Sequence, residues 1–311
     1  MTHKVLVTGS IAYDRIMDFP GYFKDQIMPE KIHSLNVSFL VNDLQESFGG
    51  TAGNIAYNLS MLQTAPVLLG VVGDRDFQSY EKWLKKNKID LTHIQVVQDK
   101  QTASAYIITD KSDNQITGFF PGAMLEPFDF KDLPPASLGI VSAQHPVDMV
   151  KLSELFKKKK IPYIFDPGQQ VTSLSGADLR RAVAGSKVLI GNDYEMALIV
   201  KKTMWGVKQL LEQTEILITT FGEKGSRIDK GLLSFDIPIV KPDNVIDPTG
   251  AGDAYRAGII KGFLEGWDLE KVGRLGSLVA AYAVENYGTQ VHRFDWESLK
   301  KRYRQSFQSE L

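Results

Sequence analysis

The sequence predicts an α/β fold: a three-layer α/β/α sandwich with a mostly parallel central sheet and a small inserted sheet. Short apolar runs rich in β-branched residues alternate with amphipathic stretches along most of the 311 residues. This alternation is typical of βαβ units, whose helices cover both faces of a parallel sheet. Residues 13–41 and 102–120 instead alternate polar and apolar side chains, as a sheet with one solvated face does. We therefore expect one domain over residues 1–311, with a lid formed by these two regions.

Six apolar runs predict the strands of the central sheet, because strands covered on both faces are continuously apolar. They are Val5–Ile11, Val67–Val72, Ile140–Ser142, Tyr163–Asp166, Val188–Gly191 and Ile216–Thr220. The periodicity of other stretches predicts helices. They are Asp76–Lys88, Val147–Lys159, Tyr194–Lys201, Gly252–Glu265 and Leu269–Tyr287. The lysine run at residues 157–160 indicates a solvated helix end rather than a nucleic-acid patch, because cations stabilise helix C-termini.

Charge and cysteine content exclude several classes of protein. The chain has 36 Lys and Arg against 37 Asp and Glu, and this net charge of −1 offers no surplus to displace counterions from nucleic acid. It has no cysteine, which excludes disulfide scaffolds, thiol nucleophiles and iron–sulfur clusters. The N-terminal residues lack a signal-peptide pattern, and the charge-free stretch Ser47–Gly73 holds glycine, asparagine and proline, unlike a membrane helix. We expect a cytoplasmic protein without nucleic-acid or membrane partners.

The segment DPTGAGD at residues 247–253 is the strongest chemical signal in the chain. Gly250, Ala251 and Gly252 are small enough for a bound group to approach the backbone closely. If a helix begins there, its free N–H groups and positive dipole end converge on one point and form an anion site. Asp253 then lies in the first turn, where it either stabilises the helix by about 0.3–1 kcal/mol or accepts the proton of an attacking hydroxyl. Spacing alone leaves both interpretations open.

The absence of other phosphate-binding motifs excludes several classes of protein. None of the 26 glycines is followed by lysine, so the chain has no Walker A loop. It has no HRD or DFG motif of a protein kinase. No GxGxxG follows the first strand, which disfavours a dinucleotide oxidoreductase, and no close histidine pair supports a zinc hydrolase.

Two motifs together resemble the signatures of a known family. The segment DPTGAGDAYRAG at residues 247–258 resembles the C-terminal signature of the PfkB, or ribokinase-like, kinases. The segment GGTAGN at residues 49–54 resembles a second signature of the same family, in the same order and separation. The resemblance extends from residue 9 to residue 289. It implies a ribokinase-like fold and an ATP-dependent transfer of phosphate to an alcohol.

The resemblance also implies roles for the residues of the C-terminal signature. It makes Asp253 the base that deprotonates the acceptor hydroxyl, and Gly250, Ala251 and Gly252 the anion hole for the migrating phosphoryl group. These roles agree with the chemistry, because phosphoryl transfer needs mainly positioning and charge stabilisation. Asp247 is similar to the residue near a monovalent-cation site, such as a K⁺ site, in many members.

The resemblance implies two further segments that bind ATP. Asn192 and Glu195 resemble the family's NxxE motif and would organise Mg²⁺ and phosphates through water, because Mg²⁺ dehydrates reluctantly. An Asn followed three residues later by Glu is also a common capping box. Thr220, Gly222 and Gly225 match the family's Thr-x-Gly-x-x-Gly ATP loop, and the alternative is an ordinary glycine-rich turn.

On the acceptor side, Asp14 ends the first core strand and enters the expected lid. A carboxylate there can accept two hydrogen bonds from the hydroxyls of a sugar or ribose. Gly49 and Gly50 allow the backbone to contact the acceptor, and Asn54 adds a donor and an acceptor. The alternative for Asn54 is an N-terminal helix cap.

Aromatic side chains near the expected lid bear on the choice between a sugar and a nucleoside. They could stack on a nucleobase, although such residues in small sheets are more often core, and they are Phe39, Tyr106, Phe119 and Phe120. The run DAYRAG resembles the adenosine-kinase-like branch of the family. We therefore predict phosphorylation of the 5′-hydroxyl of a nucleoside, with adenosine the leading acceptor. The alternatives are a sugar or sugar-phosphate kinase, and a nucleoside sensor without turnover; a monomer and a homodimer both stay open.

Overall fold

The computed structural model describes residues 4–112, 114–130 and 133–311. Within them a large sheet runs in the order β13-β12-β11-β10-β9-β8-β1-β4-β5. Its strands are β1 (Lys4–Thr8), β4 (Ala65–Gly73), β5 (Asp90–Val97), β8 (Leu138–Val141), β9 (Tyr163–Phe165), β10 (Val188–Asn192), β11 (Ile216–Thr220), β12 (Ser226–Lys230) and β13 (Leu233–Ile237). The strands from β11 to β5 pair in parallel, and only β12 and β13 are antiparallel. The mostly parallel central sheet is therefore confirmed.

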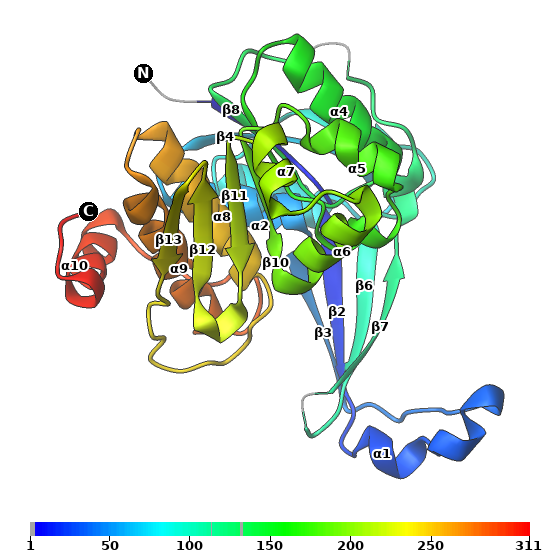
Figure 1. Ribbon diagram of the computed structural model, residues 1–311. Coiled ribbons are helices and arrows are strands. Elements are labelled where there is room, and N and C mark those ends of the chain that lie inside the picture. The colour runs from blue at the N-terminus through cyan, green and yellow to red at the C-terminus, as the bar shows by residue number, and fades with distance from the viewer. Residues whose placement is uncertain (1–3, 113, 131–132) are drawn as a thin grey trace.

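Helices cover both faces of the large sheet (Figure 1). Val5 and Val7 of β1 belong to one buried cluster with α2, α8 and α9, whereas Leu6 belongs to a second with α4, α5, α6 and α7. This two-sided burial explains why the strands are continuously apolar. The helices are α2 (Thr51–Met61), α3 (Gln78–Lys86), α4 (Pro146–Lys158), α5 (Gly176–Val183), α6 (Asp193–Thr203), α7 (Val207–Gln213), α8 (Ala251–Leu264), α9 (Leu269–Val284) and α10 (Trp296–Phe307).

Three predicted elements extend at least two residues too far, and one of them is the helix Asp76–Lys88, which is observed as Gln78–Lys86. The first strand ends at Thr8 rather than at Ile11, because the chain leaves the large sheet at Gly9. A Cβ on Gly9, whose φ is +150°, would lie 2.4 Å from the Thr51 hydroxyl, so the chain passes very close to the start of α2. The last predicted helix ends at Val284 rather than at Tyr287.

A second, smaller sheet has the order β3-β2-β6-β7 and is called the small sheet below. Its strands are β2 (Ala12–Asp18), β3 (Asp43–Gly49), β6 (Ala103–Thr109) and β7 (Gln115–Phe120). The predicted region 102–120 contains β6 and β7, with residue 113 outside the described residues. The predicted region 13–41 contains β2 but misses β3, which begins two residues later. The polar and mostly exposed sequence of β3 gave no strand signal.

Residues 19–42 form the far tip of the small sheet instead of further strands (Figure 1). This tip contains α1 (Phe23–Gln26) and a 3-10 helix (Pro29–Ser34). The rings of Phe19, Phe23 and Phe39 pack together with centroids 5.0–5.9 Å apart. The apolar residues in this region therefore build a local aromatic cluster, and Phe39 belongs to that cluster.

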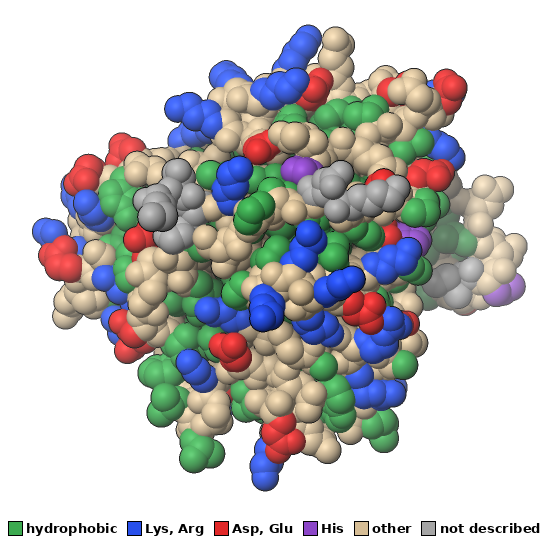
Figure 2. All heavy atoms as spheres, turned by 90° about the horizontal axis from the view of Figure 1, so that it is seen from above, with side chains coloured by type: hydrophobic (Ala, Val, Ile, Leu, Met, Phe, Trp, Pro, Cys, Tyr) green, Lys and Arg blue, Asp and Glu red, His purple; other side chains and the backbone are tan. Residues whose placement is uncertain are grey.

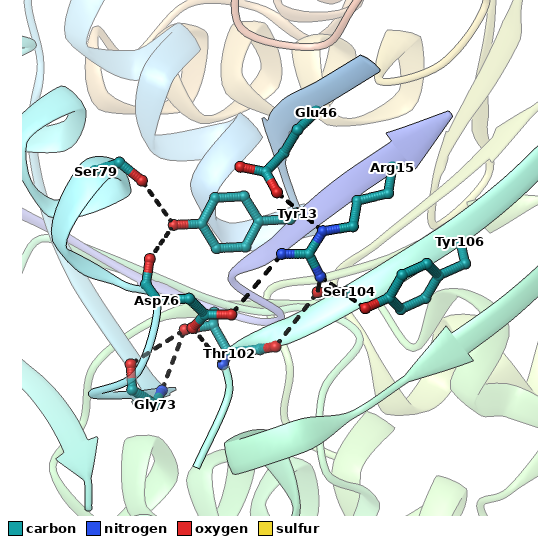
Figure 3. Close-up of polar contacts among 9 residues, drawn as sticks. All are labelled: Tyr13, Arg15, Glu46, Gly73, Asp76, Ser79, Thr102, Ser104 and Tyr106. Carbon is teal, nitrogen blue, oxygen red and sulfur yellow. Dashed lines mark hydrogen bonds and ion pairs between the residues drawn. The ribbon is translucent and has the colours of Figure 1, made fainter. Parts of the chain in front are cut away.

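Polar contacts fix the root of the small sheet to the loop that follows β4 (Figure 3). The Tyr13 hydroxyl donates a 2.6 Å hydrogen bond to the carbonyl of Asp76, and the Thr102 N–H donates to Asp76 Oδ1 at 2.8 Å. Arg15 lies 3.9 Å from Asp76 Oδ2 and donates to the Tyr106 hydroxyl at 2.9 Å. At the end nearest the large sheet, strands β2 and β6 are thus held to the large sheet and its helices, which together are called the large domain below.

The surface carries charges of both signs. Figure 2 shows Lys and Arg side chains interspersed with Asp and Glu over the face that it draws. Helix α4 ends within the lysine run, and residues 158–160 are exposed there. Within the described ranges, no helix is both long enough and apolar enough to cross a bilayer.

Candidate active site

The carboxyl ends of neighbouring parallel strands bring polar side chains together. Asp166 directly follows β9, Asn192 ends β10 and Thr220 ends β11. Asn192 and Thr220 are direct partners in the register of the two strands. In open α/β sheets, ligands bind at this edge, outside the carboxyl ends of the strands.

The start of α8 has the geometry of an anion site. Gly250 precedes the helix with a left-handed φ of +79°, and a Cβ on it would lie 2.9 Å from Thr289 Cγ2. Asp247 holds the loop, because its two carboxylate oxygens accept the N–H groups of Thr249 at 2.9 Å and Gly288 at 3.1 Å. No side chain caps α8. The Ala251 N–H donates to the carbonyl of Pro248 at 3.3 Å, whereas within the described chain the N–H groups of Gly250 and Gly252 make no hydrogen bond and can meet an anion.

Asp253 lies in the first turn of α8 but does not cap it. Its Oδ2 accepts a 2.8 Å hydrogen bond from Nδ2 of Asn54 on α2. Loss of hydration raises the pKa of Asp253 to about 7, against the opposing effect of the Arg256 cation. A carboxylate with this pKa is suited to accept a proton near neutral pH. Capping alone does not explain this position.

Asn54 links Asp253 to a buried polar network. Its Oδ1 accepts from Nε2 of Gln290 at 3.0 Å, and Gln290 also donates to the Tyr80 hydroxyl at 2.6 Å. The Tyr80 hydroxyl in turn donates to the carbonyl of Gly49 at 2.7 Å. Gly50, with φ +84°, is the N-terminal cap of α2, so the capping interpretation of Asn54 is wrong. The Asn54 side chain instead orients the carboxylate of Asp253.

Asp14 on β2 lies close to this network. A Cβ on Gly49 would lie 2.1 Å from Asp14 Oδ2, so only glycine at 49 leaves the carboxylate its place. Loss of hydration, and then the charge of Asp247, raise the pKa of Asp14 to about 6. The charge of Asp14 also raises the pKa of Asp253. The fold thus brings Asp14, which is distant in the sequence, close to the charges of Asp247 and Asp253.

The four aromatic residues considered for base stacking do not lie on one face of the small sheet. Asp14 pairs with Ala105, and Ala105 pairs with Phe119, so these three lie in one row across β2, β6 and β7. Paired side chains share a face of the sheet. Tyr106 comes directly after Ala105 on β6, and Phe120 comes directly after Phe119 on β7, so both face the opposite side of the sheet. On that side Tyr106 contacts Arg15 (Figure 3). Of the four aromatics, Phe119 shares the face of Asp14.

Asn192 and Glu195 form the capping box that the sequence left open. The Glu195 N–H donates to Asn192 Oδ1 at 2.8 Å, and the Asn192 N–H donates to Glu195 Oε2 at 2.9 Å. Burial raises the pKa of Glu195, and the nearby charge of Asp166 adds to the increase. The box fixes both side chains at the start of α6, on the edge of the sheet that faces α8.

The glycine-rich loop after β11 turns directly into β12. Gly225 has φ +89°, and a Cβ there would lie 2.2 Å from the carbonyl oxygen of Ile237. The Phe221 N–H donates to the carbonyl of Gly225 at 2.8 Å. These contacts explain Gly225 as a turn residue. Thr220 and Gly222 lie at the same sheet edge as Asn192.

Sequence reasoning missed one ion pair of the site. Nε and Nη2 of Arg256 each donate a 2.5 Å hydrogen bond to Asp166, through Oδ2 and Oδ1 respectively. Both residues are buried. The position of Asp166 at the end of a buried strand could have marked it as a site residue. Its pairing with Arg256, 90 positions away, could not be predicted from the sequence.

An uncapped helix start beside a protonatable carboxylate, at the carboxyl edge of a parallel sheet, fits a phosphoryl-transfer enzyme of the α/β class. The chain belongs to the pfkB family of carbohydrate kinases, whose model matches residues 3–295. It is therefore an ATP-dependent kinase that phosphorylates a hydroxyl group. The family resemblance and the ribokinase-like fold are both confirmed.

Similar proteins cover nearly the whole chain. It is 32% identical over 305 residues to a nucleoside kinase of Methanocaldococcus jannaschii, which covers 96% of each chain. It is 31% identical over 312 residues to a nucleoside kinase of Methanothermobacter thermautotrophicus, covering 96% and 95%. The structure of the Burkholderia thailandensis nucleoside kinase in complex with inosine matches with a TM-score of 0.90 and 36% identity, covering 98% of this chain and 99% of that one.

Proposed function

We propose that this protein transfers the γ-phosphoryl group of ATP to the 5′-hydroxyl of a purine nucleoside, with adenosine and inosine the first acceptors to test. The similarity to nucleoside kinases along nearly the whole chain supports a nucleoside acceptor. The similar Burkholderia enzyme has been solved with inosine and with ADP-inosine. The observation that carries the proposal for this chain is the row Asp14–Ala105–Phe119 on one face of the small sheet.

That row matches the two parts of a nucleoside. The Asp14 carboxylate would accept hydrogen bonds from the two ribose hydroxyls, which discriminates against analogues that lack them. Phe119 lies two strands away from Asp14, about 10 Å at the usual strand spacing. The small side chain of Ala105, between them, leaves room for a ligand to lie across the sheet. The exposed ring of Phe119 would then stack on the base. A free sugar would fill only the Asp14 end.

The chemistry follows from the residues around α8. Asp253 takes the proton of the 5′-hydroxyl while the hydroxyl oxygen forms a bond to the γ-phosphorus and the bond to the leaving ADP oxygen breaks. Asn54 holds Asp253 in place for this step. The N–H groups of Gly250, Ala251 and Gly252 stabilise the charge on the transferred phosphoryl group.

The side chains at the start of α6 fit a hydrated magnesium ion. In the described chain, no group of three or more His, Asp or Glu side chains is arranged to hold a metal by itself. Mg²⁺ usually keeps several waters and takes one or two carboxylates plus substrate phosphates. Glu195 and Asn192 would supply that limited set, and Mg²⁺ would neutralise phosphate charge when bound. Asp247 stays our candidate for a monovalent cation such as K⁺, and Thr220, Gly222 and Gly225 for ATP contacts.

We also propose that the small sheet acts as a lid over the acceptor. It carries Asp14 and Phe119, whereas Asp253 lies on the large domain. A lid excludes water and thereby suppresses hydrolysis of ATP. Adding an acceptor should therefore raise ADP release far above the rate with ATP alone. Equal rates with and without acceptor would contradict the lid.

An acceptor panel tests the proposed function. ADP release is measured with adenosine, inosine, guanosine, cytidine, ribose and fructose 6-phosphate, each with Mg²⁺ and ATP. We expect the purine nucleosides to give the highest kcat/KM. A preference for ribose or fructose 6-phosphate would replace the proposal with a sugar or sugar-phosphate kinase. Tight nucleoside binding in calorimetry without turnover on any acceptor would indicate a sensor.

A further inference from the structure

Arg256 occupies an unusual place for an arginine. It lies one turn after Gly252 in α8, and only 8% of its surface is exposed. Side chains of a helix lean toward its N-terminus. The guanidinium of Arg256 therefore lies beside the first turn of α8, the turn that offers free N–H groups to an anion.

The guanidinium has one nitrogen to spare. Nε and Nη2 are used by Asp166, and among the described residues Nη1 makes no hydrogen bond. A Cβ on Gly252 would lie 2.8 Å from Nη1. Nη1 is thus packed against the backbone of Gly252, a residue that is itself exposed. The glycine leaves the nitrogen room to reach the surface of the anion site.

The stability of the fold does not by itself explain the buried pair of Arg256 and Asp166. A buried arginine–carboxylate pair loses hydration on both sides, and packed apolar residues often serve stability as well or better. The charge of Arg256 also acts on Asp253 and on Glu195, which lie on different elements. Arg256 is therefore the cation at the centre of three carboxylates, held by one of them and directed toward the site.

We propose that Nη1 of Arg256 binds the γ-phosphoryl group of ATP during transfer, with Asp166 as the residue that positions the guanidinium. The proposal rests on phosphoryl transfer at Asp253. A guanidinium is suited to this role because it keeps its charge and offers donors in a fixed fork. Nη1 and the N–H groups of the first turn then act on the same oxygens. Arg256 would stabilise charge that develops on the phosphoryl group as it moves.

The proposal predicts a difference between nucleotides with and without a γ-phosphate. The double variant Arg256→Gln with Asp166→Asn replaces the ion pair with a neutral hydrogen-bonded pair, so that neither partner of the pair is left as a lone buried charge. Calorimetry with Mg²⁺ measures the affinity of the variant for ADP and for the non-hydrolysable ATP analogue AMP-PNP. We expect AMP-PNP affinity to fall about 10- to 100-fold, the usual value of a hydrogen bond to a charged group. ADP affinity should change less than about threefold.

The matched control removes another two-bond arginine–carboxylate pair. Arg181 donates through Nε and Nη2 to Glu154, and this pair joins α5 to α4. Arg181→Gln with Glu154→Gln should leave both nucleotide affinities unchanged. An equal fall for AMP-PNP and ADP in the Arg256 variant, or no fall for either, would overturn the proposal.

A second variant, Arg256→Lys, keeps the proposal testable if the double variant does not fold. In Arg256→Lys the single ammonium pairs with Asp166, so the ion pair survives while the contact near Gly252 is lost. The same selective loss of AMP-PNP affinity is expected, and wild-type affinity for AMP-PNP would count against the proposal. These affinities need no acceptor. A wild-type protein inactive on every nucleoside would therefore refute the acceptor proposal without touching this test.

Discussion

Nδ2 of Asn54 donates a 2.8 Å hydrogen bond to Oδ2 of Asp253, although 199 positions separate the two residues. The bond joins the first turns of α2 and α8, which carry the two signatures of the family. Asn54 also accepts from Gln290, so its amide cannot turn away from Asp253 without losing a buried hydrogen bond. The two signatures therefore form one site.

Asp253→Asn should abolish turnover and leave nucleoside binding intact. An amide cannot accept the hydroxyl proton, and loss of a general base costs about 10²–10⁴ in rate. In the wild type, kcat should rise with pH and level off above about 7, because only ionised Asp253 accepts a proton. Steady-state kinetics from pH 5 to 9 measures both effects. A variant with normal kcat, or a flat pH profile with chemistry limiting, would contradict the assignment.

The same substitution should change stability in a pH-dependent way. The pKa of Asp253 rises from 3.8 to about 7 on folding, so the folded state holds a proton that the unfolded chain has released. Wild-type stability from this residue is therefore greatest below 3.8 and is lost as the pH rises through about 7. Asp253→Asn avoids this loss. Its Tm relative to wild type should be higher at pH 8 than at pH 5, and an unchanged Tm difference would count against it.

Gly49→Ala should weaken acceptor binding without touching ATP binding. The new Cβ would overlap Asp14 Oδ2, which lies 2.1 Å from its position, and would displace the carboxylate. KM for the nucleoside should rise about tenfold or more, as expected when a charged hydrogen-bond partner is lost, while KM for ATP stays constant. Gly118→Ala is the control, because a Cβ at that position of the same sheet has open space around it. Equal effects of the two variants would contradict the role of Asp14.

Phe119→Ala and Phe120→Ala provide a matched pair for base stacking. Both rings are 43% exposed, but only Phe119 shares the face of Asp14. Stacking is worth about 1–3 kcal/mol per base, so Phe119→Ala should raise KM for the nucleoside about tenfold. Phe120→Ala should leave KM near wild type. The reverse order of effects would place the base on the other face of the small sheet.

His292 should control part of the acid stability. Its Nε2 lies 2.8 Å from Asn58 Oδ1, and burial lowers its pKa from 6.5 to about 4. The unfolded chain therefore binds a proton that the folded protein rejects between these values. The stabilising contribution is fully present above pH 6.5 and is lost as the pH falls toward 4. Denaturant titrations should show a shallower acid loss in His292→Gln, whereas the exposed-residue control His33→Gln should match wild type.

Six strands of the large sheet and five of the helices were predictable because their signal is local, whereas β5, β12 and β13 at the ends of the sheet were not predicted. Strands such as Val188–Gly191 are apolar on both faces, and the signature glycines mark a helix start by composition alone. The strand β3 was missed because its polar residues face solvent and its pairing partner comes from elsewhere in the chain. The pairing of Arg256 with Asp166 depends on where two distant elements meet, and no local pattern encodes that.

The distribution of residues between the two sheets has a consequence for how such an enzyme can change. Asp14 and Phe119 belong to the small sheet, whereas Asp253 and the start of α8 belong to the large domain. Under the proposed function, acceptor choice and phosphoryl transfer thus use separate stretches of backbone. Replacing the acceptor-facing residues of β2, β6 and β7 would then change the acceptor, while the residues around α8 and the reaction stay the same. The residues that transfer the phosphoryl group could therefore stay constant while the residues that bind the acceptor change.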